Sequence, residues 1–177
     1  PAPADTARAA KRVFDLGRTL RQTHETCRTL AEKSGTVLDW HVPADLGQRY
    51  EGPAGELEDV LRLLLEDAVR ATKGGKVHFA VRRVPDSKHP GHLLFQVRDT
   101  GTGLPPEQRS ASLLSRIWEL SSSHGGFLGV ESGPRGTSVI FTLQLQIPED
   151  PDDDLPTVLV CAPDDATRRE LGAMLRD

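Results

Sequence analysis

The stretch VRDTGTGLPPEQ, residues 97–108, places an aspartate, two glycines and a double proline directly after an alternating hydrophobic run. Asp-x-Gly and Pro-Pro are common in turns, so a simple turn is one interpretation of this stretch. A ligand pocket is the other: Asp99 would accept a hydrogen bond at a strand end, while Gly101 and Gly103 would let the backbone approach a flat ligand closely. The surrounding sequence has to decide between the two.

The hydrophobic pattern around this stretch predicts the order helix, strand, helix, hairpin, helix, hairpin. Apolar residues recur at helical spacing in three segments, and alternation predicts five strands between them. The expected helices span residues 14–35, 54–75 and 107–123, and the expected strands span 36–42, 76–84, 92–99, 125–133 and 136–147. One mixed sheet with its helices on one face satisfies this order, so we expect an α+β fold, a two-layer α/β sandwich.

Composition narrows the class of protein and its partners. The chain has 177 residues, 37% of them hydrophobic, and a formal net charge of −4, which gives no reason to expect nucleic acid as a partner. No apolar run has the length of a membrane span, and the first residues lack a signal peptide, so we expect a cytoplasmic location without direct membrane contact. Cys27 and Cys161 are isolated, and their spacing does not predict a zinc site.

The C-terminal part of the chain departs from the pattern. Residues 148–156, PEDPDDDLP, combine three prolines with five acids, a composition that predicts a linker rather than a core. Residues 157–177 then predict one buried strand and one amphipathic helix, too little to fold alone. We therefore expect a domain at 1–147, an acidic, proline-rich linker at 148–156, and the start of a second domain at 157–177.

The ordered set of elements closely resembles the ATP-binding domain of sensor histidine kinases. That domain is part of the wider family of gyrase, Hsp90, histidine kinase and MutL ATPases. The resemblance covers roughly residues 14–147, and the D-x-G-x-G box of that family matches at residues 99–103. Residues 157–177 are similar to the opening of a response-regulator receiver domain. Together the two resemblances imply a Bergerat-type ATP-binding fold within a hybrid sensor histidine kinase of a two-component system.

The resemblance assigns roles to residues of the opening stretch and of the long helix. In the family, the acid that matches Asp99 accepts a hydrogen bond from the adenine amino group, and the glycines that match Gly101 and Gly103 shape the loop beside the base. Asp67 matches an asparagine that holds Mg²⁺ and the phosphates of ATP. At 3.6 residues per turn, Asp67 is expected about 100° from the centre of the apolar stripe of its helix, at the edge that faces a groove. A carboxylate also binds Mg²⁺ well, so Asp67 is either a metal ligand or a solvated acid on a helix flank. Arg70 matches a basic neighbour of the phosphates.

The second glycine-rich turn of the family has no counterpart here. Counting back from Gly125 and Gly126 places it at residues 111–114, which contain no glycine, and only residues 104–111 remain for a lid. The backbone N–H groups of that turn would otherwise hold the phosphates. We therefore expect degenerate phosphate-binding elements, with four apolar residues of the following helix in the core instead: Leu113, Leu114, Ile117 and Leu120.

Three functions remain open from the sequence, and an unrelated small binding domain is the least favoured of them. The first is the ATP-binding catalytic domain of a hybrid sensor histidine kinase, with ATP and Mg²⁺ as cofactors. The second is a pseudo-ATPase scaffold or regulatory module that no longer binds nucleotide. In either case the expected partners are an upstream dimerisation and phosphoacceptor domain and the receiver domain of the same parent chain, which itself can be anchored in a membrane. Alone, this part of the chain is not expected to be catalytic, because it holds neither phosphoacceptor.

Overall fold

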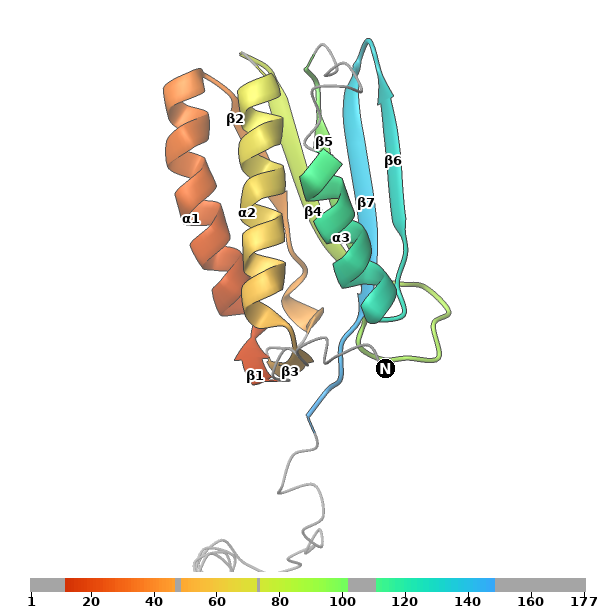
Figure 1. The fold of residues 1–177 in the computed structure, drawn as a ribbon. Coiled ribbons are helices and arrows are strands. Elements are labelled where there is room, and N and C mark those ends of the chain that lie inside the picture. Colours follow the sequence, from red (N-terminus) through yellow and green to blue (C-terminus); the bar gives the residue numbers. More distant parts are fainter. Residues whose placement is uncertain (1–11, 47–48, 73, 102–110, 149–177) are drawn as a thin grey trace, which may run out of the picture.

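A five-stranded mixed sheet forms one layer of the structure, and three helices packed on one of its faces form the other (Figure 1). The coordinates are a computed structural model, and the structure describes residues 12–46, 49–72, 74–101 and 111–148. The α+β two-layer sandwich expected from the sequence is therefore confirmed. Within the described residues, no helix combines the length and the apolar character that a membrane crossing would need.

The sheet has the order β2-β4-β5-β7-β6. Among the described strands, β2 and β4 are parallel, and the remaining three neighbouring pairs of the sheet are antiparallel. The strands are β2 (Val37–His41), β4 (Lys76–Arg83), β5 (His92–Asp99), β6 (Leu128–Gly133) and β7 (Gly136–Gln144). At the centre, Phe95 of β5 lies opposite Phe141 of β7, and their rings stack with centroids 5.0 Å apart.

The helices are α1 (Leu16–Ser34), α2 (Ala54–Ala71) and α3 (Ala111–Ser123). Each buries the apolar stripe that its sequence predicts, and burial of such a stripe supplies most of the stability of a surface helix. In α2, the central helix, the buried side chains are Leu57, Val60, Leu61, Leu64, Leu65, Ala68 and Val69. They meet the buried faces of β4 and β5, so the hydrophobic core lies between the two layers.

A small second sheet of two strands was missed by the sequence analysis. β1 (Arg12–Asp15) pairs antiparallel with β3 (Arg49–Gly52), which places Phe14 opposite Tyr50. The expected helix at 14–35 therefore begins two residues later, with the Asp15 side chain accepting a hydrogen bond from the backbone N–H of Arg18 at 2.8 Å. This two-stranded sheet lies at the end of the sandwich where α2 begins (Figure 1).

The segment that leaves β7 is bound to this small sheet. Backbone hydrogen bonds run in both directions between Glu51 of β3 and Gln146, at 2.8 and 3.2 Å. The strand that enters the domain and the segment that leaves it are therefore held together at one end of the molecule.

Candidate functional site

A cavity lies between the C-terminal half of α2, the start of α3 and the ends of β5 and β7. The empty space within it is about 510 Å³, a figure that includes open solvent at its mouth. Most of the lining is apolar, with two carboxylates and one hydroxyl among the side chains. The described lining residues are Leu64, Asp67, Ala68, Ala71, Val97, Asp99, Leu113, Leu114, Thr137 and Val139. Such a lining suits a flat apolar ring that carries a few hydrogen-bonding groups.

Asp99 is the most buried charged group of the cavity, with only 6% of its surface exposed. Its Oδ1 accepts hydrogen bonds from the backbone N–H of Gly101 at 2.9 Å and from that of Thr137 at 3.2 Å. Among the described residues, both donors that bind this carboxylate are bound by Oδ1. This arrangement fixes the side chain and leaves Oδ2 to accept a hydrogen bond from a donor in the cavity.

Gly101 and Gly136 allow the backbone to close around Asp99. A Cβ atom on Gly101 would lie 2.6 Å from the carbonyl oxygen of Ala71, so only glycine lets this loop pass so close to the end of α2. Gly136 has φ +121, and a Cβ atom there would lie 1.9 Å from the carbonyl oxygen of Asp99. The role of Gly101 beside a base stays a prediction, and Gly136 is a second glycine next to Asp99 that the sequence analysis did not single out.

Thr137 was also missed by the sequence analysis. It lines the cavity and lies at the start of β7, 38 residues after Asp99. The pairing of β5 with β7 brings it next to Asp99, and no local pattern in the sequence predicts that pairing. The one local feature that could have directed attention to Thr137 is the Gly-Thr pair directly after the turn of the second hairpin.

Asp67 lies on the cavity side of α2, as the helical periodicity predicted. Its side chain is half-buried, and the resulting loss of solvation raises the pKa of its carboxyl group, with a smaller lowering effect from Arg70 and a small raising effect from Glu66. A desolvated carboxylate that faces a cavity is chemically suited to a divalent cation, which would restore the lost solvation. Whether Asp67 binds Mg²⁺ stays a prediction.

The raised pKa predicts a stabilising effect of Asp67→Asn in the protein without ligand. Because the pKa in the folded state lies above that in the unfolded state, the folded state binds the proton more tightly. The contribution of Asp67 to the free energy of unfolding is therefore most favourable below the unfolded pKa and declines as the pH rises through the folded pKa. We expect Asp67→Asn to raise the melting temperature at pH 7, and the gain to shrink as the pH falls towards 4.

Thermal unfolding by circular dichroism between pH 4 and 8 measures this effect. Glu25→Gln, at an exposed position on α1, is the control and should show no comparable gain. A gain that is independent of pH, or a loss of stability at neutral pH, would contradict the desolvation of Asp67.

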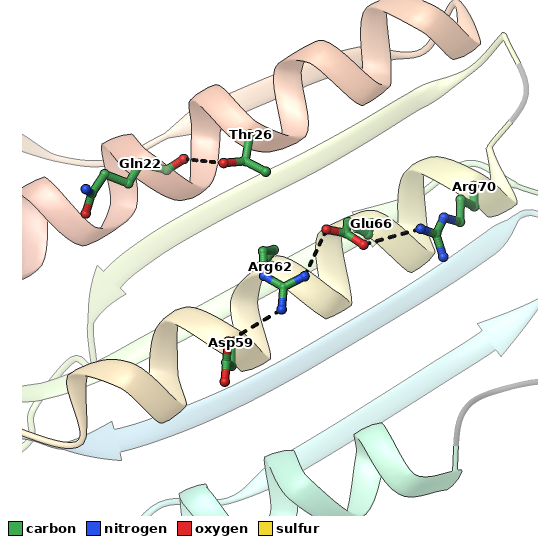
Figure 2. A network of polar contacts seen from close by, with 6 residues as sticks. All are labelled: Gln22, Thr26, Asp59, Arg62, Glu66 and Arg70. Atoms are coloured by element: carbon green, nitrogen blue, oxygen red, sulfur yellow. Dashed lines mark hydrogen bonds and ion pairs between the residues drawn. The ribbon is translucent and has the colours of Figure 1, made fainter.

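Arg70 is not brought to the cavity with Asp67. Figure 2 shows its guanidinium directed along α2 towards Glu66, with Nη2 lying 3.4 Å from Oε2. The other carboxylate oxygen of Glu66 contacts Arg62, which also reaches Asp59. The four side chains thus form a chain of ion pairs on the surface of α2, and the structure gives Arg70 a partner in this network rather than a place in the cavity lining.

The sequence analysis placed the family's second glycine-rich turn at residues 111–114 and noted that no glycine remains there. In the structure, these residues form the first turn of α3. Leu113 and Leu114 line the cavity, and Leu113, Ile117 and Leu120 are buried in the core as predicted, while Leu114 is partly buried. Gly103 and residues 104–110 of the expected lid lie outside the described residues, whereas Ala111, the last lid residue, begins α3. The predicted linker from residue 149 onward and residues 157–177 also lie outside the described residues.

The part of the chain that builds this cavity also matches a known protein family. Residues 52–147, more than half of the chain, match the model of the histidine kinase-, DNA gyrase B-, and HSP90-like ATPases. The chain belongs to this ATPase family. Its cavity uses α2, β5, α3 and β7, all of which lie within the matched residues.

Known proteins that resemble the chain are histidine kinases. The sensor histidine kinase AruS of Pseudomonas aeruginosa is 27% identical over 132 residues, which are 75% of this chain but only 13% of AruS. The chain therefore spans a small part of the length of this curated relative.

Solved structures agree on the fold at low sequence identity. The catalytic domain of histidine kinase ThkA superposes with a TM-score of 0.63 at 20% identity, covering 78% of this chain and 99% of that domain. Full-length ShkA, solved in complex with AMPPNP, gives 0.64 at 23% identity over 84% of this chain and 34% of ShkA. AdeS of Acinetobacter baumannii gives 0.62 at 13% identity over 80% of this chain and 70% of AdeS.

Proposed function

We propose that this chain is the ATP-binding catalytic domain of a hybrid sensor histidine kinase in two-component signalling, with degenerate phosphate-binding elements. The observation that carries the proposal is Asp99, a buried carboxylate held by two backbone N–H groups at the edge of a mostly apolar cavity. Membership of the ATPase family supports ATP as the ligand, and AruS, a sensor histidine kinase, supports the signalling context.

Asp99 accounts for recognition of the base. An ionised carboxylate only accepts hydrogen bonds, so Oδ2 favours the amino group of adenine over the carbonyl group that guanine has at the same position. The apolar side chains of α2, β5 and β7 would contact the two faces of the ring. Thr137 and Gly101 hold the carboxylate in place through their backbone N–H groups.

The phosphate side of the cavity supports weak binding of the triphosphate. None of the described residues that line the cavity is basic, and Leu113 and Leu114 occupy the start of α3. Asp67 would repel phosphates unless a metal ion lies between them. Mg²⁺ bound by Asp67 would supply the positive charge that the described lining lacks.

The remaining parts of the proposal concern the parent chain. We assign residues 148–156 to a linker and residues 157–177 to the start of a receiver domain, on their composition and pattern. The phosphoacceptor histidine would belong to an upstream dimerisation domain, so phosphotransfer would need that domain as a partner, and the location would be cytoplasmic. The leucines at the start of α3 favour one second candidate, a pseudo-ATPase scaffold that uses the fold for protein contacts alone.

Calorimetric titration with ATP and with ADP, each with and without Mg²⁺, tests the proposal. Because the base supplies most of the contact in a cavity whose described lining has no basic residue, ADP should bind within about tenfold of ATP, a difference of about 1.4 kcal/mol or less. If Asp67 holds the metal, Mg²⁺ should strengthen binding of both nucleotides, and Asp67→Asn should weaken this dependence without abolishing binding.

The possible results separate the two candidates. Binding of neither nucleotide at millimolar concentration would reject the ATP-binding function and leave the scaffold. Equal affinities with and without Mg²⁺ would exclude the metal role of Asp67 while leaving the adenine site intact.

A further inference from the structure

The face of the sheet opposite the helices carries a cluster of two histidines and one aspartate. In β2, Leu38 and Trp40 pack against the core, so the alternating residues Asp39 and His41 point to the other face. In β4, both neighbours of His78 are fully buried, which places His78 on that same open face. The cluster is thus on the other side of the sheet from the cavity of Asp99.

The pairing of β2 with β4 brings the three side chains together. Asp39 lies directly opposite His78 in this parallel pair, and His41 lies opposite Ala80. Because Ala80 has only a methyl group, it leaves room for the ring of His41 to lie near that of His78, with ring centroids 5.3 Å apart.

The distances within the cluster match those between the ligands of one metal ion. Asp39 Oδ2 lies 3.0 Å from Nδ1 of His78, and Asp39 Oδ1 lies 3.4 Å from Nδ1 of His41. All three potential ligand atoms lie within 4.8 Å of one another. Ligand atoms at 2.0–2.1 Å from a tetrahedral Zn²⁺ are about 3.3 Å from each other, so small side-chain rotations suffice to surround an ion.

The chemistry of the three ligands selects a transition metal over Mg²⁺. Imidazole nitrogens suit Zn²⁺, Ni²⁺ and Cu²⁺, whereas Mg²⁺ prefers oxygen ligands and keeps most of its water. The side chains of Asp39 and His78 are about one third exposed and that of His41 is two thirds exposed, so an ion can enter from solvent and complete its shell with water. Lys76 and Arg98 lie beside the cluster in the sheet, and their charges weaken the binding of any cation.

We propose that Asp39, His41 and His78 form a binding site for a divalent transition-metal ion, with Zn²⁺ as the probe that represents the class. The bound ion would connect β2, a strand at the edge of the sheet, to β4 through their side chains as well as through their backbone. Binding should therefore stabilise this edge and raise the melting temperature. The site is independent of the proposed nucleotide function.

Calorimetric titration with ZnCl₂ tests this site in the Cys161→Ser background, which removes one competing thiol. The other cysteine, Cys27, is buried in the core, and its burial, followed by the charge of Glu66, raises the pKa of the thiol to about 11, so it stays protonated. We expect one Zn²⁺ per chain and a higher melting temperature. His41→Ala and His78→Ala should each reduce the affinity by at least about tenfold, and Asp39→Asn should also weaken binding.

Controls distinguish this site from general binding by imidazole. His89→Ala removes a histidine of the β4–β5 loop and should leave Zn²⁺ affinity unchanged, as should a large excess of Mg²⁺. His41→Ala should retain the circular dichroism spectrum and the nucleotide affinity of the unchanged chain, since His41 is exposed and lies on the other face of the sheet. Absence of Zn²⁺ binding, or a Zn²⁺ affinity in His41→Ala or His78→Ala equal to that of the unchanged chain, would overturn the proposal.

Discussion

Asp99→Asn should reduce the affinity for ATP and ADP by about 1.5–3 kcal/mol, roughly 10- to 150-fold. In the unchanged chain, Oδ1 already accepts two backbone hydrogen bonds, from Gly101 and Thr137. An asparagine must turn its carbonyl oxygen towards these two donors, because its NH₂ group would face them without an acceptor. The NH₂ group then takes the place of Oδ2, so the cavity presents a donor to the amino group of adenine.

The same substitution should reverse the preference for the base. A purine with a carbonyl group at this position, such as that of inosine diphosphate, should bind poorly to the unchanged chain and better than ADP to Asp99→Asn. Fluorescence competition with a labelled ADP measures both affinities, and Glu25→Gln, at an exposed position on α1, is the matched control. If Asp99→Asn leaves the affinities for both bases unchanged, Asp99 belongs to a turn and not to a binding site.

Gly136→Ala should destabilise the fold by about 3 kcal/mol or more. Alanine disfavours φ +121, and its Cβ atom would lie 1.9 Å from the carbonyl oxygen of Asp99, so the start of β7 must move away from β5. This movement would also break the hydrogen bond from Thr137 to Asp99. Urea denaturation measures the loss in the free energy of unfolding.

Gly133 offers a control in the same hairpin. It pairs with Gly136 across the β6–β7 turn, but a Cβ atom on it would meet nothing within 4 Å, and it does not have a positive φ. Gly133→Ala should therefore change the stability by no more than about 0.5 kcal/mol. Equal effects of the two substitutions would show that the contact between Gly136 and Asp99 does not constrain the hairpin.

The layered fold could be predicted because its long elements carry strong periodic patterns. The stripe of α2 and the alternation of β4 and β5 each extend over eight residues or more, so the pattern outweighs local exceptions. β1 and β3 have four residues each, too few for any alternation to be distinguished from chance. They pair across distant parts of the chain, with Phe14 opposite Tyr50, and no local pattern indicates this pairing.

The residues of the candidate site likewise fall into those that the sequence predicted and those that it missed. Asp99 and Gly101 belong to one short motif, so the sequence predicted them, and the placement of Asp67 followed from the helical period. Thr137 could not be predicted, since it reaches Asp99 only through the β5–β7 pairing. The cluster of Asp39 and His78 was missed for the same reason: the two residues are 39 positions apart, and only the parallel register brings them together.

The hydrogen bonds between Glu51 and Gln146 determine how the domain can be joined to others. Together with the pairing of β1 with β3, they hold the incoming and outgoing segments at the end where α2 begins. On the same helix, the cavity is lined by residues between 64 and 71. At 1.5 Å per residue, Asp67 lies roughly 20 Å along α2 from its first residue, Ala54. Any chain attached at either segment would therefore start far from the residues that line the cavity, and its length could change without a change in that lining.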